Sequence, residues 1–67
     1  MNNFGTILHD LRSEYGISQQ KLAVALGVSQ KAIDFWEKGI NEPKASYIKK
    51  IAIFFKVSAD YLLGLEC

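Results

Sequence analysis

The segment QQKLAVALGVSQKAIDFWEK, residues 19–38, decides the fold of this chain. Gly27 lies in its middle, and apolar residues recur at helical spacing on both sides of that glycine. Ser29 follows shortly after and is a good N-cap, because its hydroxyl can accept a hydrogen bond from a free backbone N–H of the next turn. The pattern predicts two short helices, 19–26 and about 30–38, joined by a tight turn. The inward side of this pair is predicted to hold Leu22, Ala23, Leu26, Val28, Ile33 and Trp36.

The residues before this segment predict one more helix. Apolar residues recur there every three or four positions, which is the spacing of one face of an amphipathic helix. Gly16 follows as a left-handed C-cap, and Ser18 is the N-cap of the helix that begins at Gln19. The predicted inner face of the first helix is Phe4, Ile7, Leu8, Leu11 and Tyr15, and on or near its water side lie His9, Asp10, Arg12 and Ser13.

The residues after the segment predict two further helices. Gly39 ends the third helix, and Pro43 lies in the following loop or in the opening turn of the fourth. A second valine-serine pair, Val57-Ser58, predicts a cap for a short fifth helix over residues 59–63. The alternation typical of strands occurs nowhere, so the predicted fold class is all-α. The inner face of the fourth helix is predicted to be Ile48, Ile51, Ala52 and Phe55.

Length and composition restrict the possible classes of protein. With 67 residues, the chain has room for a single domain, 1–67, with a small core. Its 49% hydrophobic and 22% charged residues are typical of a globular chain. The single cysteine, Cys67, cannot close an intrachain disulfide, and neither a secretion signal nor a membrane span is present, so we expect a soluble, cytoplasmic protein. The net charge of +1 is only a weak indication of nucleic-acid binding.

Three stretches of the chain have an order and spacing that can be compared with known families. They are ISQQKLA at 17–23, LGVS at 26–29 leading to Ile33 and WEKG at 36–39, and IA at 51–52 with VSADYLLG at 57–64. In all three the chain resembles the Cro and phage-repressor helix-turn-helix proteins, also called XRE-type regulators. The resemblance implies a five-helix, lambda repressor-like domain whose third helix enters the DNA major groove. It also implies a dimer on a pseudo-palindromic operator.

The outward side of the predicted third helix carries the candidate base-reading residues. By resemblance, Gln30, Lys31 and Asp34 occupy positions that face base edges or nearby phosphates. Glutamine can pair with adenine, lysine can donate to guanine and aspartate can accept from cytosine, whereas the alternative for all three is an ordinary solvated face. Phe35 either contacts a thymine methyl group or extends the core. Trp36 lies on the inner stripe and is predicted to belong to the core.

Phosphate contacts are expected at helix ends, where free backbone N–H groups and the helix dipole favour an anion. The resemblance implies such contacts for Gln19, at the start of the second helix, and for Lys38, at the end of the third. The alternative for each lysine is a solubilising surface charge. The predicted phosphate-contacting residues are Ser18, Gln19, Lys21, Ser29, Lys38 and Lys44.

Two further predictions concern stability and assembly. By resemblance, Arg12 and Glu37 form a salt bridge between the first helix and the end of the third. Apolar residues beside the predicted inner face of the C-terminal third favour a two-fold symmetric dimer, although packing within the domain explains any one of them about as well. The predicted dimer interface is Tyr47, Ile53, Phe54, Tyr61 and Leu65.

No arrangement of residues predicts catalysis, a cofactor, a small-molecule ligand or a metal site. His9 has no partner at a metal-ligand spacing, and no nucleophile stands with a base and an orienting group. The sequence therefore indicates a sequence-specific regulator of transcription that binds double-stranded DNA, most simply a repressor. The alternative is an antitoxin-like or other protein-interaction module of the same fold, which the low net charge and the outward Phe35 leave open.

Overall fold

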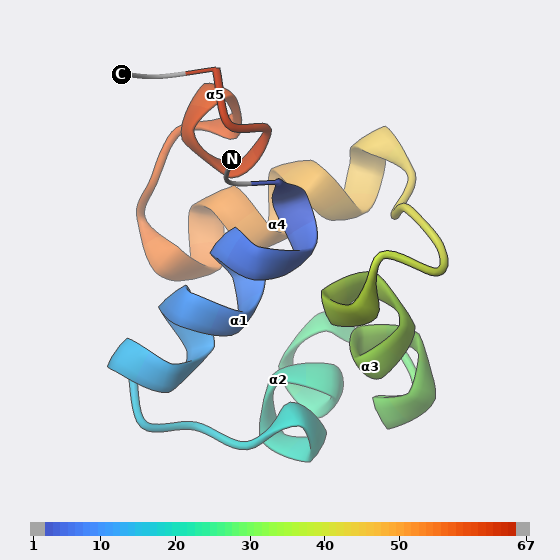
Figure 1. Cartoon of the computed structure of the whole chain (residues 1–67). Coiled ribbons are helices and arrows are strands. Elements are labelled where there is room, and N and C mark those ends of the chain that lie inside the picture. Colours follow the sequence, from blue (N-terminus) through green and yellow to red (C-terminus); the bar gives the residue numbers. More distant parts are fainter. Residues whose placement is uncertain (1–2, 66–67) are drawn as a thin grey trace.

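A computed structural model describes residues 3–65, which form α-helices without any strand (Figure 1). The all-α prediction is confirmed, and so are the bounds of the two helices in the segment 19–38. The predicted fifth helix ends one residue early, and Pro43 lies in the loop before the N-cap of the fourth helix instead of in its opening turn. The helices are α1 (Phe4–Glu14), α2 (Gln19–Leu26), α3 (Gln30–Lys38), α4 (Ala45–Phe55) and α5 (Ala59–Leu62).

Side-chain caps begin four of the helices. The three predicted serine caps are present, and each Oγ accepts a hydrogen bond from the backbone N–H three residues later, at 3.0–3.1 Å. Asn3 begins α1 in the same way, with its Oδ1 accepting from the N–H of Thr6 at 3.0 Å. The bounds of these helices therefore follow from local hydrogen bonds that the sequence encodes. The serine caps are Ser18, Ser29 and Ser58.

The turn between α2 and α3 depends on a left-handed backbone at Gly27, where φ is +74°. This conformation lets the N–H of Val28 donate to the carbonyl of Ala23 at 3.0 Å and brings Ser29 to the start of α3. The end of α4 has the same local geometry, but there a lysine, Lys56, adopts the left-handed conformation with φ of +58°.

The core lies where all five helices meet. α1 packs on α3 and α5, α2 on α3 and α4, and α4 on α5. The predicted inner face of α1 is wrong at Tyr15, which is the C-cap residue after the end of the helix and is 51% exposed. Its ring meets Phe55 edge-on, and its hydroxyl donates to the Phe55 carbonyl at 2.9 Å. The buried core is Ile7, Leu8, Leu11, Leu22, Ala23, Leu26, Ile33, Trp36, Ile51, Ala52, Phe55 and Leu62.

A glycine in α1 permits a close approach to the end of α3. A Cβ atom on Gly5 would lie 2.6 Å from the carbonyl oxygen of Trp36 and 2.7 Å from that of Glu37. Any larger residue would therefore push the two helices apart. The position of α3 on the body of the domain depends on this contact, which the apolar pattern of the sequence did not reveal.

Candidate nucleic-acid interface

α3 lies at the edge of the molecule (Figure 1). Ile33 and Trp36 are buried against the rest of the domain, whereas Gln30 and Lys31 are exposed. The two side chains stand at the N-terminal end of the helix, directly after the turn from α2. This end of a recognition helix is the part that reaches base edges in a major groove.

The other two predicted base-reading residues, Asp34 and Phe35, are half-buried. Within residues 3–65, the half-buried hydrophobic residues that pack against the core do not include Phe35. Instead, the ammonium nitrogen of Lys31 lies 5.6 Å from the centre of the Phe35 ring, within the range of a cation–π contact. Of its two alternatives, the outward role of Phe35 is therefore favoured over an extension of the core.

The starts of α2 and α3 carry the two predicted serines. Ser18 and Ser29 each accept a backbone hydrogen bond through Oγ, and a hydroxyl that accepts a bond still has its own O–H to donate. Both serines are exposed, as are Lys21 on α2 and Lys44 at the start of α4. The starts of α2 and α3 therefore both carry accessible donors, which is an arrangement that suits phosphate oxygens.

A network of hydrogen bonds joins α1, α2 and α3 beside this face. The guanidinium of Arg12 donates from Nε to Glu37 Oε2 at 2.7 Å, and the predicted salt bridge is present. The amide nitrogen of Gln19 donates to Glu37 Oε1 at 3.1 Å and to Asp34 Oδ1 at 3.2 Å. The other carboxylate oxygen of Asp34 pairs with Lys38 Nζ at 3.0 Å. One connected set thus includes five of the predicted site residues, which are Arg12, Gln19, Asp34, Glu37 and Lys38.

These contacts shift two pKa values. The hydrogen bond from Lys38, and then that from Gln19, holds the pKa of Asp34 below its usual 3.8. The hydrogen bond to Glu37 raises the pKa of Arg12, against the opposing effect of burial. Arg12 had been expected on or near the water side of α1, but only 16% of its side chain is exposed, because it turns inward to Glu37. At neutral pH, both Asp34 and Arg12 are therefore charged.

The inward role of Gln19 was missed by the sequence analysis. Gln19 was predicted to contact a phosphate, whereas its amide here joins two carboxylates that lie on another helix. Its Oε1 also accepts from Gln30 Nε2, at 3.5 Å. A glutamine at the start of a helix carries no signal for such contacts in the sequence, because its partners are 11 to 18 residues away.

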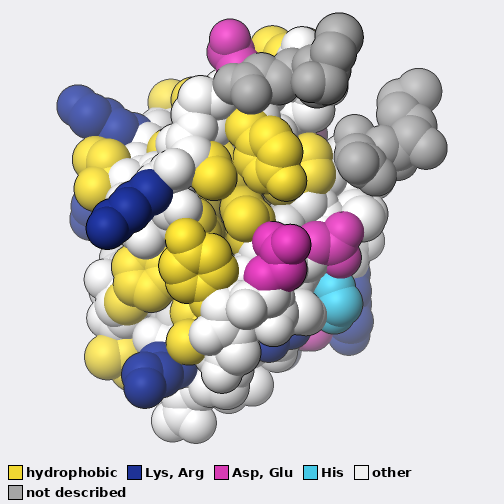
Figure 2. Space-filling model, turned by 90° about the vertical axis from the view of Figure 1, so that its left-hand side faces the viewer, with side chains coloured by type: hydrophobic (Ala, Val, Ile, Leu, Met, Phe, Trp, Pro, Cys, Tyr) yellow, Lys and Arg dark blue, Asp and Glu magenta, His cyan; other side chains and the backbone are white. Residues whose placement is uncertain are grey.

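Most of the predicted dimer residues are exposed. Ile53, Phe54, Tyr61 and Leu65 are open to solvent, whereas Tyr47 is half-buried with its ring 5.7 Å from that of Trp36. Figure 2 shows the side of the molecule turned away from α3, where hydrophobic side chains gather and charged side chains of both signs surround them.

The remaining predictions concern single residues and the membrane. His9 is exposed, with Nδ1 at 3.4 Å from Asp10 Oδ1. In the part of the chain that the structure describes, no three metal-ligating side chains come together, and no helix has the length and apolar character to cross a membrane. Cys67, for which no disulfide was expected, lies outside the described residues.

The comparisons with known proteins agree with this geometry. The helix-turn-helix family model matches residues 8–62. The chain is 40% identical over 63 residues to the HTH-type transcriptional activator BcrR of Enterococcus faecalis. The aligned residues cover 94% of this chain and 31% of BcrR. It is 33% identical over 61 residues to the cryptic phage CTXphi transcriptional repressor RstR of Vibrio cholerae, covering 91% of this chain and 55% of RstR. The chain thus spans about a third to about half of these relatives.

Solved structures with the same fold include two regulators. The P22 c2 repressor in complex with a synthetic operator matches with a TM-score of 0.92 and 29% identity, over 98% of this chain and 100% of that one. The restriction-modification controller protein C.AhdI of Aeromonas hydrophila matches with a TM-score of 0.82 and 28% identity, over 90% and 91%. The chain therefore belongs to the non-enzymatic helix-turn-helix family of DNA-binding transcriptional regulators, in the XRE-type group of Cro and phage repressors.

Proposed function

We propose that this chain represses transcription by binding a double-stranded operator with α3 in the major groove. The observation that carries the proposal is the exposed polar face at the start of α3, where Gln30 and Lys31 have no role in the core. The P22 c2 repressor, which has the same fold, was solved in complex with a synthetic operator, and the relative RstR is named a repressor. Occupation of the operator requires no chemistry and no cofactor, and it takes place in the cytoplasm.

The side chains around α3 divide into two groups in this proposal. Gln30 and Lys31 read base edges, and the ring of Phe35 lies against a thymine methyl group. The second group binds phosphates and sets the position of α3 without reading sequence. Its members are Ser18, Gln19, Lys21, Ser29, Lys38 and Lys44.

The proposal includes a two-fold symmetric dimer. One reading helix covers only a few base pairs, and dimers of this motif place two such helices about one DNA turn apart, roughly 34–36 Å. The exposed apolar residues of the C-terminal third supply a contact surface. Hydrophobic side chains also gather on the side of the molecule away from α3 (Figure 2).

Selection of bound sequences from a random duplex library tests the proposal directly. We expect enrichment of a pseudo-palindromic site with two half-sites about one turn apart. A titration of an arbitrary duplex at increasing salt supplies the second measurement, because release of counterions makes phosphate contacts strongly salt-dependent. If the library shows no enriched sequence and the affinity for duplex DNA shows no salt dependence, operator binding is ruled out.

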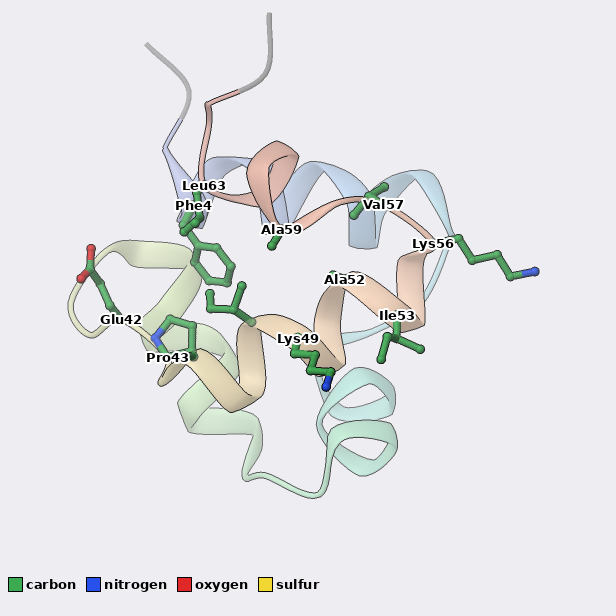
Figure 3. A pocket seen from close by; sticks show the side chains of 12 residues that line it. Phe4, Glu42, Pro43, Lys49, Ala52, Ile53, Lys56, Val57, Ala59 and Leu63 are labelled. Atoms are coloured by element: carbon green, nitrogen blue, oxygen red, sulfur yellow. The ribbon is translucent and has the colours of Figure 1, made fainter.

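A protein-interaction module is the second candidate function, and one feature favours it. A groove of about 830 Å³ runs between the start of α1, α4 and α5, and its lining is mostly apolar (Figure 3). Phe4, Pro43, Ala59 and Lys56 are among the residues that line the groove, and the side chain of Lys56 extends away from the other three (Figure 3). An antitoxin-like protein that used only this groove would show no salt-dependent affinity for duplex DNA.

A further inference from the structure

The carboxylate of Asp34 already holds two of the groups that the proposed function assigns to DNA phosphates. Its Oδ1 accepts from the amide nitrogen of Gln19 at 3.2 Å, and its Oδ2 pairs with Lys38 Nζ at 3.0 Å. One donor comes from the start of α2 and the other from the end of α3. Asp34 thus bridges the two helices with the same kind of charge-assisted contacts that a phosphate group makes.

The neighbouring carboxylate, Glu37, has a different environment. Only 6% of its side chain is exposed, and Arg12 supplies its main partner. Asp34 is 31% exposed, and the side chain of Lys38 is 62% exposed. Glu37 therefore belongs to the interior of the domain, whereas Asp34 and its lysine lie on the surface that faces the DNA in the proposed complex.

We propose that Asp34 is an intramolecular competitor of the DNA backbone, which occupies Gln19 and Lys38 in the free protein and weakens binding to duplex DNA of any sequence. This inference rests on the proposed function, because it requires that α2 and α3 approach phosphates. A phosphate that binds Lys38 must displace or share the Asp34 carboxylate, and it must also approach a negative charge. Asp34 in this role is a positioning residue and does not accept from a cytosine amino group.

Two effects follow from this arrangement. Removal of the carboxylate charge releases Lys38 for a phosphate contact, and each additional phosphate neutralised steepens the dependence of log affinity on log salt by about 0.9. Removal also takes away one repulsive charge, so the affinity for an arbitrary duplex increases by roughly fivefold at low salt, which is the scale of one surface ion pair. The low pKa of Asp34 means that this competition operates throughout the neutral range.

The test measures the affinity of the full chain for one arbitrary 20-base-pair duplex at several salt concentrations. The variants are Asp34→Asn and a control of equal charge change, Asp10→Asn, whose side chain is 66% exposed on α1. We expect Asp34→Asn to bind the duplex several-fold more tightly with a steeper salt slope, and Asp10→Asn to change both quantities far less. Thermal unfolding of both variants establishes that they fold.

Three results would overturn the inference. Equal effects of the two variants would mean that only net charge matters. Unchanged binding of Asp34→Asn to the arbitrary duplex, with weaker binding to the selected operator, would show that Asp34 reads a base. Absence of any salt-dependent binding by the wild-type chain would remove the proposed function as well, and that result is distinguishable from the other two.

Discussion

At the scale of single residues, Gln19 connects the interior of the domain with its reading face. Its amide nitrogen donates to Asp34 and Glu37, while its oxygen accepts from Gln30 at the long limit of a hydrogen bond, 3.5 Å. The orientation of Gln30, for which we propose a base-reading role, is therefore linked through Gln19 to a carboxylate pair on the same helix. Such pre-organisation lowers the entropy cost of binding.

Base reading by α3 leads to the first prediction. Gln30→Ala and Lys31→Ala should each cost about 1–3 kcal/mol on the selected operator and relax the base preference at one position, because each removes hydrogen bonds to a base edge. Competition binding against single-base variants of the operator measures both effects. Lys49→Ala, on α4, is the control. Wild-type affinity and preference in both variants would mean that α3 is not the reader.

The ion pair on the surface of α3 leads to the second prediction. The pKa of Asp34, measured by NMR titration of its carboxyl carbon, should lie below 3.8, and Lys38→Met should move it back up, because Lys38 is its main stabilising partner. A carboxyl group whose pKa is lower in the folded than in the unfolded state stabilises the fold at pH values above its unfolded-state pKa. This stabilisation is lost as the pH falls through the lower pKa of the folded state. Wild type and Asp34→Asn should therefore converge in stability at acid pH. If Lys38→Met leaves the pKa of Asp34 unchanged, the result contradicts the ion pair between Asp34 and Lys38.

At the scale of elements, two turns use the same backbone with different residues. Gly27 and Lys56 both have positive φ, and the following valines donate to carbonyls one turn back, at 3.0 Å in each case. Glycine adopts this conformation without steric cost, whereas a residue with a Cβ pays about 1 kcal/mol or slightly more. The turn after α4 is therefore the more strained of the two.

The third prediction compares these turns. Lys56→Gly should stabilise the domain by roughly 0.5–1 kcal/mol, since relief of strain exceeds the greater chain entropy of glycine in the unfolded state. Gly27→Ala should destabilise it by about 1–2 kcal/mol, although no atom stands within 4 Å of the added Cβ. Urea denaturation gives both values. Destabilisation by Lys56→Gly would show that contacts of the lysine side chain outweigh the strain.

The fourth prediction concerns the pair between α1 and α3. Arg12→Ala leaves Glu37, whose side chain is 6% exposed, without its cation, and also removes a hydrogen bond of 2.9 Å from Arg12 to the carbonyl of Ile17. The expected loss of stability is roughly 3 kcal/mol or more, well above the ~0–1 kcal/mol of an exposed pair. A double-mutant cycle with Glu37→Gln measures the coupling. A negligible coupling energy would mean that the pair contributes nothing specific.

At the scale of the whole molecule, α3 and a gathering of hydrophobic side chains lie on different sides (Figures 1 and 2). α3 is at one edge, and Tyr61 and Leu65 lie at and after the short α5. This separation allows the chain to contact DNA and a second copy at the same time. The described residues fit within 29 × 24 × 22 Å, so two subunits side by side can span one DNA turn.

The fifth prediction follows from this arrangement. Tyr61→Glu combined with Leu65→Lys should weaken self-association and cooperative operator binding by about tenfold or more, because charges replace apolar contact surface. Circular dichroism should show unchanged helix content, since both residues are exposed. Sedimentation of the wild type with and without operator supplies the reference. A wild type that stays monomeric on its operator would contradict the dimer.

The sequence by itself determined the parts of this protein that depend on neighbours along the chain. Caps at Ser18, Ser29 and Ser58 and the left-handed turn at Gly27 involve residues three to five positions apart, and the buried faces follow from helical periodicity. The helix bounds and most of the core were predictable for that reason. The Arg12–Glu37 pair came from resemblance to a family, because periodicity alone had set Arg12 on or near the water side.

Only the tertiary structure decided the contacts between residues far apart in the chain. The exposure of Tyr15, the close approach at Gly5 and the engagement of Gln19 by Asp34 all depend on the angles and distances at which helices pack. Periodicity indicates which side of a helix turns inward, but not which atom of a neighbouring helix it meets. Whether Asp34 faced a base, solvent or its own domain was therefore open in the sequence, and in the free protein the carboxylate meets Gln19 and Lys38 because the turn at Gly27 folds α2 against α3.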